Sequence, residues 1–201
     1  MSDLKSLEKL KDEFEKFPSV GTKSAERIAF NFLSMSDEEV NRVLEAINEV
    51  RTKIHKCPIC GLLTEQESCT ICNDPNRNHD VCIVMLNSKD VGAFDKVDNF
   101  NGVYHVLSST INPSRMYLED NSGVNEFVKR VEKEHIKEVI FTFGSSIEEQ
   151  VTTVIISNLL SPLGVKVSKI AHGIQHGQSL EYVDALSLKD ALDGRVEFKS
   201  K

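Results

Sequence analysis

Several features are scarce or missing in this sequence of 201 residues, and each absence excludes a class of protein. Tryptophan is absent and aromatic residues make up only 6%, so side chains on which nucleic-acid bases could stack are few. No apolar run approaches the ~18 residues that span a bilayer, and the N-terminal stretch is too charged for a secretory signal peptide. We therefore expect a cytoplasmic protein that makes no membrane contact.

An excess of positive charge is also missing. Lys and Arg number 24 against 31 Asp and Glu, a formal net charge of -7. This argues against nucleic acid covering the whole surface, because neutralising phosphates needs a local excess of Lys and Arg. Residues 1–56 carry ten basic and eleven acidic side chains, whereas residues 57–201 carry fourteen and twenty. If nucleic acid binds, the N-terminal segment is the better place.

Hydrophobic residues make up 40% of the chain, as in ordinary globular proteins. In the first quarter they recur with a helical period, which predicts three helices in a row. The first is expected over residues 3–16, and the second follows a turn that contains Gly21, with Thr22 or Ser24 as its cap. Ser36 and Glu39 form a capping box for the third, which is expected to end near residue 55.

From residue 81 onward, strand-like and helix-like segments alternate, which predicts a parallel sheet with crossover helices. Strands are predicted at 81–86, 103–107, 138–143 and 165–170, and helices at 90–97, from about 124, and at 147–160. The polar stretch 108–122 is predicted to be a loop.

A cysteine cluster separates the helical and the alternating regions. Two CxxC pairs supply four thiolates, and two such turns can close a tetrahedral zinc site. A glycine, Gly61, follows the first pair, where a zinc knuckle needs a left-handed backbone. The predicted ligands of one structural zinc per chain are Cys57, Cys60, Cys69 and Cys72. With every position filled by sulfur, no open position is left for catalysis by the metal.

Alternatives to this zinc site remain open. The two pairs could instead form disulfides or redox-active dithiols, although a doubled motif in a cytosolic chain favours zinc. His55 or His79 could in principle replace a cysteine as ligand. Cys82 falls inside a predicted strand, so it is interpreted as a buried apolar residue and not as a fifth ligand.

The turn before the second helix is a candidate phosphate-binding site. Amide groups freed at Gly21 and at the helix start can donate to phosphate oxygens, and Lys23 and Arg27 project beside them from one helical face. An ordinary helical hairpin with solvated charges explains the local pattern equally well.

The order of these parts resembles the recombination mediator family RecR over essentially the whole chain. The most specific matches are VGTKSAERIAF, TEQESCTIC and, near the C-terminus, IAHG and LEYVD. The resemblance implies an α+β protein of four parts. These are a helix-hairpin-helix DNA-binding domain (1–55), a four-cysteine zinc finger (56–79), a Toprim-like α/β domain with a parallel sheet (80–171) and a C-terminal oligomerisation segment (172–201).

The resemblance also implies a function. It points to a non-enzymatic clamp in recombinational DNA repair that binds single-stranded, gapped or duplex DNA and assembles as a homotetrameric ring. It implies RecO-type or RecF-type partner proteins and the loading of recombinase. Gly21, Lys23 and Arg27 lie at the family's DNA-binding turn, and the four cysteines match its zinc ligands.

Departures from the family pattern occur in the hairpin and in the Toprim loops. Where the hairpin usually reads G-V-G-P, this chain has Ser19, Val20, Gly21 and Thr22. The loop after the second Toprim strand has lost its acid-and-glycine pattern. Of the family's N-P-x-x-E-G-E segment only Glu148 stays in register, which makes it a candidate partner-binding residue.

Two other functions remain open from the sequence. The first is a magnesium-dependent Toprim nuclease or primase, which would need further carboxylates beside Glu148, for example Asp90, Glu119 or Asp120. Glu148 is equally explained as an exposed residue in the first turn of a helix. The second is a degenerate scaffold that has kept its assembly surfaces and lost DNA binding.

Overall fold

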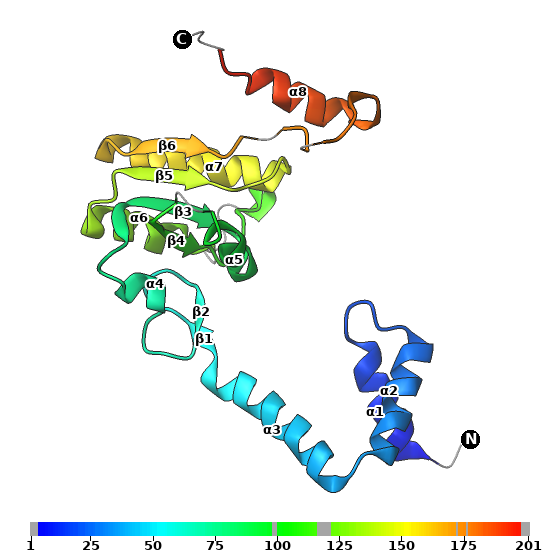
Figure 1. Cartoon of the computed structure of the whole chain (residues 1–201). Coiled ribbons are helices and arrows are strands. Elements are labelled where there is room, and N and C mark those ends of the chain that lie inside the picture. The colour runs from blue at the N-terminus through cyan, green and yellow to red at the C-terminus, as the bar shows by residue number, and fades with distance from the viewer. Residues whose placement is uncertain (1–3, 98–99, 116–121, 172, 176, 198–201) are drawn as a thin grey trace. The chain divides into compact units, whose positions relative to one another are not determined.

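A computed structural model describes residues 4–97, 100–115, 122–171, 173–175 and 177–197 of the chain (Figure 1). The chain divides into two compact units, residues 1–54 and 55–201. Along the described part of the chain, no helix is both long enough and apolar enough to cross a membrane.

The described part of the first unit consists of three helices: α1 (Lys5–Glu15), α2 (Thr22–Ser34) and α3 (Asp37–Lys53). Helices α1 and α2 pack together, with Phe14 stacked on Phe32 at 5.7 Å between ring centroids. The expected capping box at the start of α3 is confirmed, because the Ser36 hydroxyl accepts from the Glu39 amide and the Glu39 carboxylate accepts from the Ser36 amide.

The predicted cap of α2 is wrong. Helix α2 begins at Thr22, so Thr22 and Ser24 lie inside its first turn and cannot precede it. The residue at the N-cap position is Gly21, in an extended conformation (φ -88°, ψ 171°), and no side chain caps the helix. The prediction failed because the turn ends one residue earlier than the polar residues suggested.

The second unit is built on a parallel sheet of four strands in the order β4-β3-β5-β6. The strands are β3 (Asn78–Met85), β4 (Gly102–Val106), β5 (Glu138–Phe141) and β6 (Lys166–Lys169). Ile83 of the central strand β3 lies beside Tyr104 of β4 and Ile140 of β5. The predicted parallel sheet is confirmed, and β3 begins three residues before the predicted strand.

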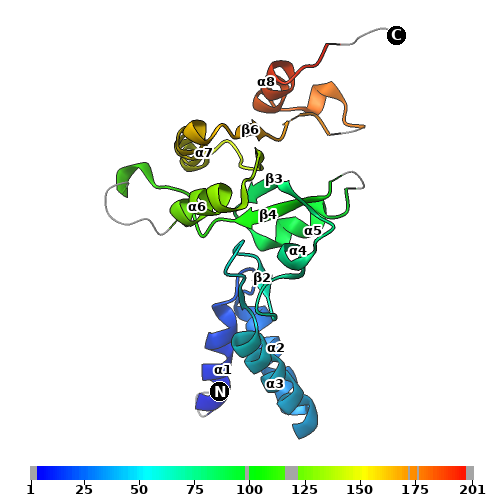
Figure 2. The ribbon, with the colours of Figure 1, turned by 90° about the vertical axis from the view of Figure 1, so that its left-hand side faces the viewer.

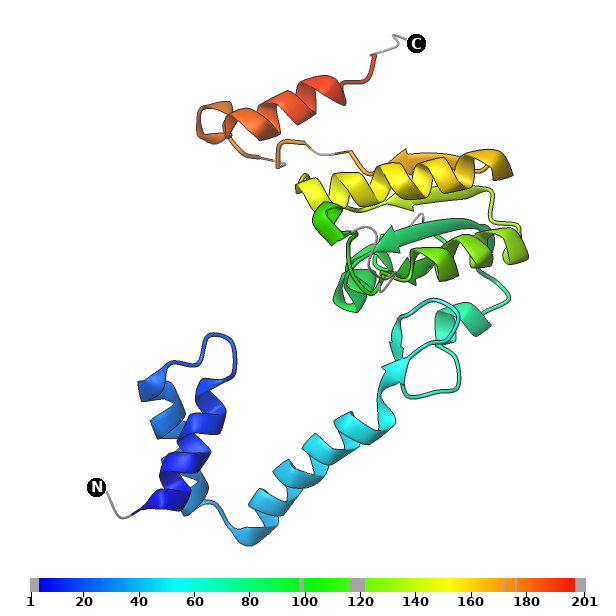
Figure 3. The same ribbon diagram turned by 180° about the vertical axis from the view of Figure 1, so that it is seen from behind.

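Helices cover both faces of this sheet. Figure 2 shows α6 (Val124–Glu134) and α7 (Ile147–Leu160) on one side and α5 (Val91–Phe94) on the other, and Figure 3 shows α6 and α7 in front of the strands. The helix predicted at 90–97 is shorter, a 3₁₀ turn at Ser88–Asp90 followed by α5. Gly92 within this segment is a poor helix former. Between the sheet and the helices lie fully buried side chains, among them Met85, Tyr104, Phe127, Phe141 and Ile156.

Short elements complete the second unit. Strands β1 (His55–Lys56) and β2 (Leu63–Thr64) form an antiparallel pair, and α4 (Thr70–Asn73) follows them. Single 3₁₀ turns occur at Pro113–Arg115, Ser161–Leu163 and Leu180–Tyr182. The last helix, α8 (Ala185–Asp193), is capped by the Asp184 carboxylate, which accepts from the amides of Leu186 and Ser187.

Candidate metal centre and nucleic-acid interface

The two CxxC pairs come together in one buried cluster. Cys57 and Cys60 lie in the turn between β1 and β2, while Cys69 is the N-cap of α4 and Cys72 lies within it. All four sulfur atoms lie within 4.8 Å of one another. Such a group of four thiols, three of them buried, matches the donor set and the compactness of a closed tetrahedral zinc site.

Backbone amides around the cluster donate hydrogen bonds to the sulfurs and so stabilise negatively charged thiolates. The amide of Cys69 donates to the sulfur of Cys57 at 3.4 Å, and the amide of Cys72 donates to the sulfur of Cys69 at 3.4 Å. The pKa of Cys69 is lowered, chiefly because the Cys60 and Cys72 thiols are directed at its sulfur. The same contact raises the pKa of Cys60. Zinc binds thiolates, so a cluster that stabilises a thiolate suits the ion.

A glycine fastens the first zinc knuckle to the sheet. Gly61 has a left-handed backbone (φ +74°), as the sequence predicted, and a Cβ at this position would lie 2.4 Å from the Val106 carbonyl oxygen. The Val106 amide donates to the Cys60 carbonyl at 2.7 Å. Any larger residue at position 61 would therefore separate the zinc finger from β4.

The other candidate ligands lie elsewhere. Neither His55 nor His79 belongs to the four-sulfur cluster. The Nε2 atom of His79 lies 3.2 Å from the Asp74 carbonyl oxygen. Cys82 is fully buried in β3, and burial raises the pKa of its thiol to about 12. The interpretation of Cys82 as a buried apolar residue is confirmed.

The proposed phosphate-binding residues lie together at the start of α2. Lys23 and Arg27 are exposed and stand about one helical turn apart, in the part of α2 that follows Gly21. Since no side chain caps α2, the amides of its first turn remain donors that point out of the helix end. A Cβ at Gly21 would have no atom of the described residues within 4 Å, so packing against those residues does not require a glycine there.

Glu148 lies at the second position of α7 and is exposed. The capping box of α7 uses its neighbour Glu149, whose carboxylate accepts from the Ser146 hydroxyl at 2.7 Å, a bond that lowers the pKa of Glu149. Asp90, a suggested magnesium ligand, is exposed at the end of a 3₁₀ turn. Glu119 and Asp120 fall outside the described residues. Across the described part of the chain, the cysteine cluster is the one group of three or more potential ligands close enough to share an ion.

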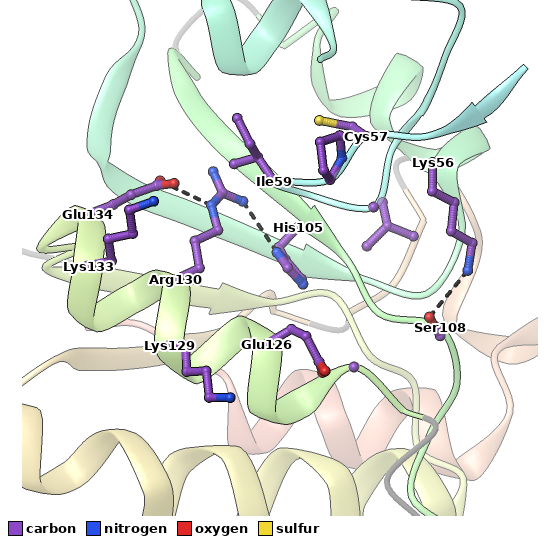
Figure 4. Close-up of a pocket in the computed structure, with 14 residues that line it drawn as sticks. Lys56, Cys57, Ile59, His105, Ser108, Glu126, Lys129, Arg130, Lys133 and Glu134 are labelled. Carbon is purple, nitrogen blue, oxygen red and sulfur yellow. Dashed lines mark hydrogen bonds and ion pairs between the residues drawn. The ribbon is translucent and has the colours of Figure 1, made fainter. Parts of the chain in front are cut away.

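Sequence reasoning missed a cavity of about 570 Å³ beside the zinc finger (Figure 4). Residues of the first knuckle, of β4 and of α6 line it, including Lys56, Ile59, Lys129 and Lys133. We call this cavity the knuckle pocket. A sequence signal existed, because residue 130 lies on the buried face of α6 beside Phe127 and Val131 and is an arginine. A buried arginine usually has a specific partner or task.

Arg130 joins α6 to the sheet beside this pocket. Its Nε donates to the Glu134 carboxylate at 3.0 Å, and its Nη1 donates to the Tyr104 carbonyl at 2.8 Å and lies 3.3 Å from Nδ1 of His105. The His105 ring packs on Phe127 with 4.7 Å between centroids. Burial and the nearby guanidinium lower the pKa of His105 to about 3, so His105 is neutral and can accept from Arg130.

Family models match three segments of the chain in sequence order. The model for the helix-hairpin-helix of RecR matches residues 7–51, and the model for the four-cysteine zinc finger domain of RecR matches residues 54–74. A Toprim domain model matches residues 80–171. The middle segment contains all four clustered cysteines, so the zinc-finger match and the geometry agree on one structural zinc.

Proposed function

The chain belongs to the RecR family, and from this premise we propose that it is a DNA-binding recombination mediator, a clamp that recruits partner proteins and helps to load recombinase. The family domains support DNA binding and a role in recombinational repair. The finer steps are our proposal: the protein acts on gapped or single-stranded DNA in the cytoplasm, cooperates with RecO-type or RecF-type proteins, and breaks or forms no covalent bond itself.

The start of α2 is the observation that carries this proposal. A helix N-terminus concentrates partial positive charge and unpaired amide donors, which together attract phosphate. Here the helix start lacks a side-chain cap, and two exposed cations, Lys23 and Arg27, stand beside it. This arrangement contacts the backbone of DNA and leaves the bases unread, as a mediator that acts at any sequence requires.

A salt series tests the hairpin. Binding of a fluorescent gapped DNA is measured for the wild type and for the Lys23→Ala/Arg27→Ala variant. Each lost phosphate contact on duplex lowers the slope of log K against log salt by about 0.9, so we expect a clear fall in slope and in affinity. Lys5→Ala/Lys9→Ala is the matched control, because both lysines are exposed and four residues apart on α1. Equal losses in the two double variants would refute the assignment of Lys23 and Arg27.

Gly21→Ser gives a second test with opposite signs for stability and binding. The extended backbone at Gly21 accepts any residue, and a serine there can cap α2. The first unit should therefore gain a few tenths of a kcal/mol (~0.3) in stability. The serine hydroxyl occupies the amides that phosphate needs, so DNA affinity should fall. Unchanged affinity in a stabilised protein would show that these amides do not contact DNA.

Assembly into a ring is the proposed role of the C-terminal segment 172–201. Large apolar side chains on and around α8 are exposed in the single chain: Leu180, Tyr182, Leu186, Leu192 and Val196. An apolar surface of this kind favours burial against another protein surface. Light scattering of the wild type and of Leu186→Glu tests this role, and a tetramer that persists in Leu186→Glu would count against it.

The Toprim match supports one enzymatic alternative, in which the protein is a magnesium-dependent nuclease or primase. Glu148, at the exposed start of α7, is the residue that such an enzyme would use. Cleavage or synthesis that requires magnesium or manganese, and that Glu148→Gln abolishes, would establish this activity. For the mediator we expect no turnover with either ion, and loss of partner binding in Glu148→Gln. A folded, zinc-loaded ring without DNA affinity would instead identify a degenerate scaffold.

A further inference from the structure

The knuckle pocket lies entirely within the second unit, between the first zinc knuckle and α6 (Figure 4). Its volume of about 570 Å³ falls within the ~300–1,000 Å³ of typical small-molecule sites. One wall carries the cationic side chains of α6, and the opposite side carries Pro58 and Ile59 of the zinc knuckle.

The charge of the pocket is opposite to that of the chain. Four cationic side chains line it, Lys56, Lys129, Arg130 and Lys133, against the two carboxylates of Glu126 and Glu134. The difference, four minus two, is a local charge of +2 in a chain whose net charge is -7. Such a reversal concentrates anions at one place on the surface.

The lysines of the pocket are available to an anion. Within the described part of the chain, neither Lys129 nor Lys133 pairs with a carboxylate, and both are exposed. They lie four residues apart, so they project from one face of α6. Lys56 approaches from β1, where its Nζ donates to the Ser108 hydroxyl at 3.2 Å. Lysines from two elements therefore line the same pocket.

Arg130 also lines the pocket, and only some of its guanidinium nitrogens have hydrogen-bond partners. Its side chain is 5% exposed, and its Nη2 atom is buried with no hydrogen-bond partner among the described residues. The carboxylate of Glu134 engages Nε alone, and the remaining partners are the neutral His105 ring and a carbonyl group. A buried donor without a partner is costly, and an acceptor oxygen of an anion in the pocket would supply the partner that Nη2 lacks.

The apolar part of the lining indicates what accompanies the anion. Pro58, Ile59 and Val106 contribute carbon surface to the same pocket that the lysines enter. A bare phosphate would leave this surface unused, whereas a nucleotide unit presents a phosphate joined to a sugar and a flat base. We propose that the knuckle pocket binds a nucleotide unit, with its phosphate at Lys56, Lys129 and Lys133 and its nucleoside against the zinc knuckle.

The same chemistry is offered by a free mononucleotide and by one unit of a DNA strand. In the second case the pocket is a further contact for the strand and rests on the proposed DNA-binding function. It is separate from the α2 site because all of its residues belong to the second unit. The two contacts can therefore be removed independently.

The experiment uses the full-length, zinc-loaded protein and two probes. Lys129→Ala/Lys133→Ala is compared with Lys89→Ala/Lys96→Ala, which removes two exposed lysines of the same unit outside the pocket. A fluorescent oligo-dT is titrated in a salt series, in each variant alone and combined with Lys23→Ala/Arg27→Ala. In parallel, dTMP and inorganic phosphate are titrated while the amide NMR signals of α6 are followed.

We expect Lys129→Ala/Lys133→Ala to weaken oligo-dT binding about five-fold and to lower the salt slope by about 0.7, since the pocket holds one phosphate and a single-strand phosphate contact contributes about 0.7. The control variant should bind as the wild type does. Signals of α6 that respond to dTMP more than to phosphate would support the apolar contact. If dTMP shifts them and oligo-dT binding is unchanged in the variant, the ligand is a free nucleotide.

Three results would overturn the inference. In the first, dTMP leaves the α6 signals unmoved and the pocket variant binds oligo-dT as its control does, even though Lys23→Ala/Arg27→Ala abolishes binding. The proposed function would then stand without the pocket. In the second, a polyglutamate peptide shifts the signals as strongly as dTMP, which would assign the pocket to acidic protein segments. In the third, the responses persist in Lys129→Ala/Lys133→Ala. Loss of binding in the pocket variant alone, with the hairpin variant unaffected, would support the pocket and refute the α2 site.

Discussion

The zinc finger and the start of α2 position their functional groups in opposite ways. The finger collects four sulfurs in a buried, closed cluster that is fastened to the sheet by Gly61 and the Val106 amide. The start of α2 leaves its amides uncapped and its two cations exposed. In the zinc finger, all four sulfurs are used to bind the structural zinc that stabilises the fold. At the start of α2, the amides and the two cations remain available to bind another molecule.

The two units also differ in how much core supports them. The second unit has a continuous buried core between a sheet and its helices, and the cysteine cluster extends it. In the first unit, the described residues that are fully buried are Ala25 and Ala29. Small local energies such as caps and backbone strain therefore weigh more in the helical unit than in the second unit.

Among the changes that test this comparison, removal of the zinc should have the largest effect on stability. Zinc contributes on the order of 10 kcal/mol to the folding of isolated zinc fingers, so Cys60→Ser should lose the ion and unfold residues 57–74. The α-helical signal of the first unit should survive. Zinc content by mass spectrometry, with limited proteolysis, measures the result. Cys82→Ala is the matched control, since it removes a buried thiol outside the cluster. Full zinc content in Cys60→Ser would exclude the four-sulfur site.

Replacing Arg130 should produce the next largest effect. Arg130→Ala removes the bonds to Glu134, the Tyr104 carbonyl and His105 and leaves a void beneath α6. We expect a loss of about 3 kcal/mol in the stability of the second unit, because buried charged networks tolerate the loss of one partner poorly. Lys129→Ala, one residue earlier and exposed, should change stability by less than ~0.5 kcal/mol. Urea unfolding of both variants checks the contrast, which would fail if their midpoints coincided.

The same contrast explains how much the sequence could predict. The zinc ligands follow from residue type and spacing, since each CxxC pair is a local turn, and the Ser36 capping box is also local. The knuckle pocket forms because Lys56 and Lys129, which are far apart in the sequence, line one cavity. No local sequence pattern predicts that these two residues lie close to the same cavity. The misplaced α2 cap shows that several polar residues in a row do not identify which one precedes the helix.

Acid should weaken the second unit through His105. Its pKa is about 3 in the native state and about 6.5 when unfolded, so the unfolded chain binds more protons between these values. Stability therefore rises with pH in this window, and about 2 kcal/mol should be lost between pH 7 and pH 5. His105→Gln keeps an acceptor for Arg130 and removes the titration. Unfolding is measured at each pH with zinc content verified, and a parallel fall in both proteins would contradict the assignment.

A smaller effect than that of His105 is expected in the helical unit, at Ser19. Ser19 has a left-handed backbone (φ 67°) in the turn before α2. Glycine occupies this region without penalty, whereas a residue with a Cβ is strained by about 1 kcal/mol. Ser19→Gly should stabilise the first unit by up to about 1 kcal/mol, less the greater entropy of glycine in the unfolded chain. Hydrogen exchange of the α2 amides in the full-length protein measures this change in local stability.

A matched control for Ser19→Gly is Ser34→Gly, which places a glycine at the last residue of α2, where no positive φ requires it. Ser34→Gly should lower protection of the α2 amides, since glycine is a poor helix residue, by at most about 1 kcal/mol. Opposite changes in the two variants would show that the turn before α2 is strained at Ser19. Equal changes would mean that the turn relaxes to another conformation. In that case the uncapped amides of α2, on which the proposed phosphate binding depends, would also be repositioned.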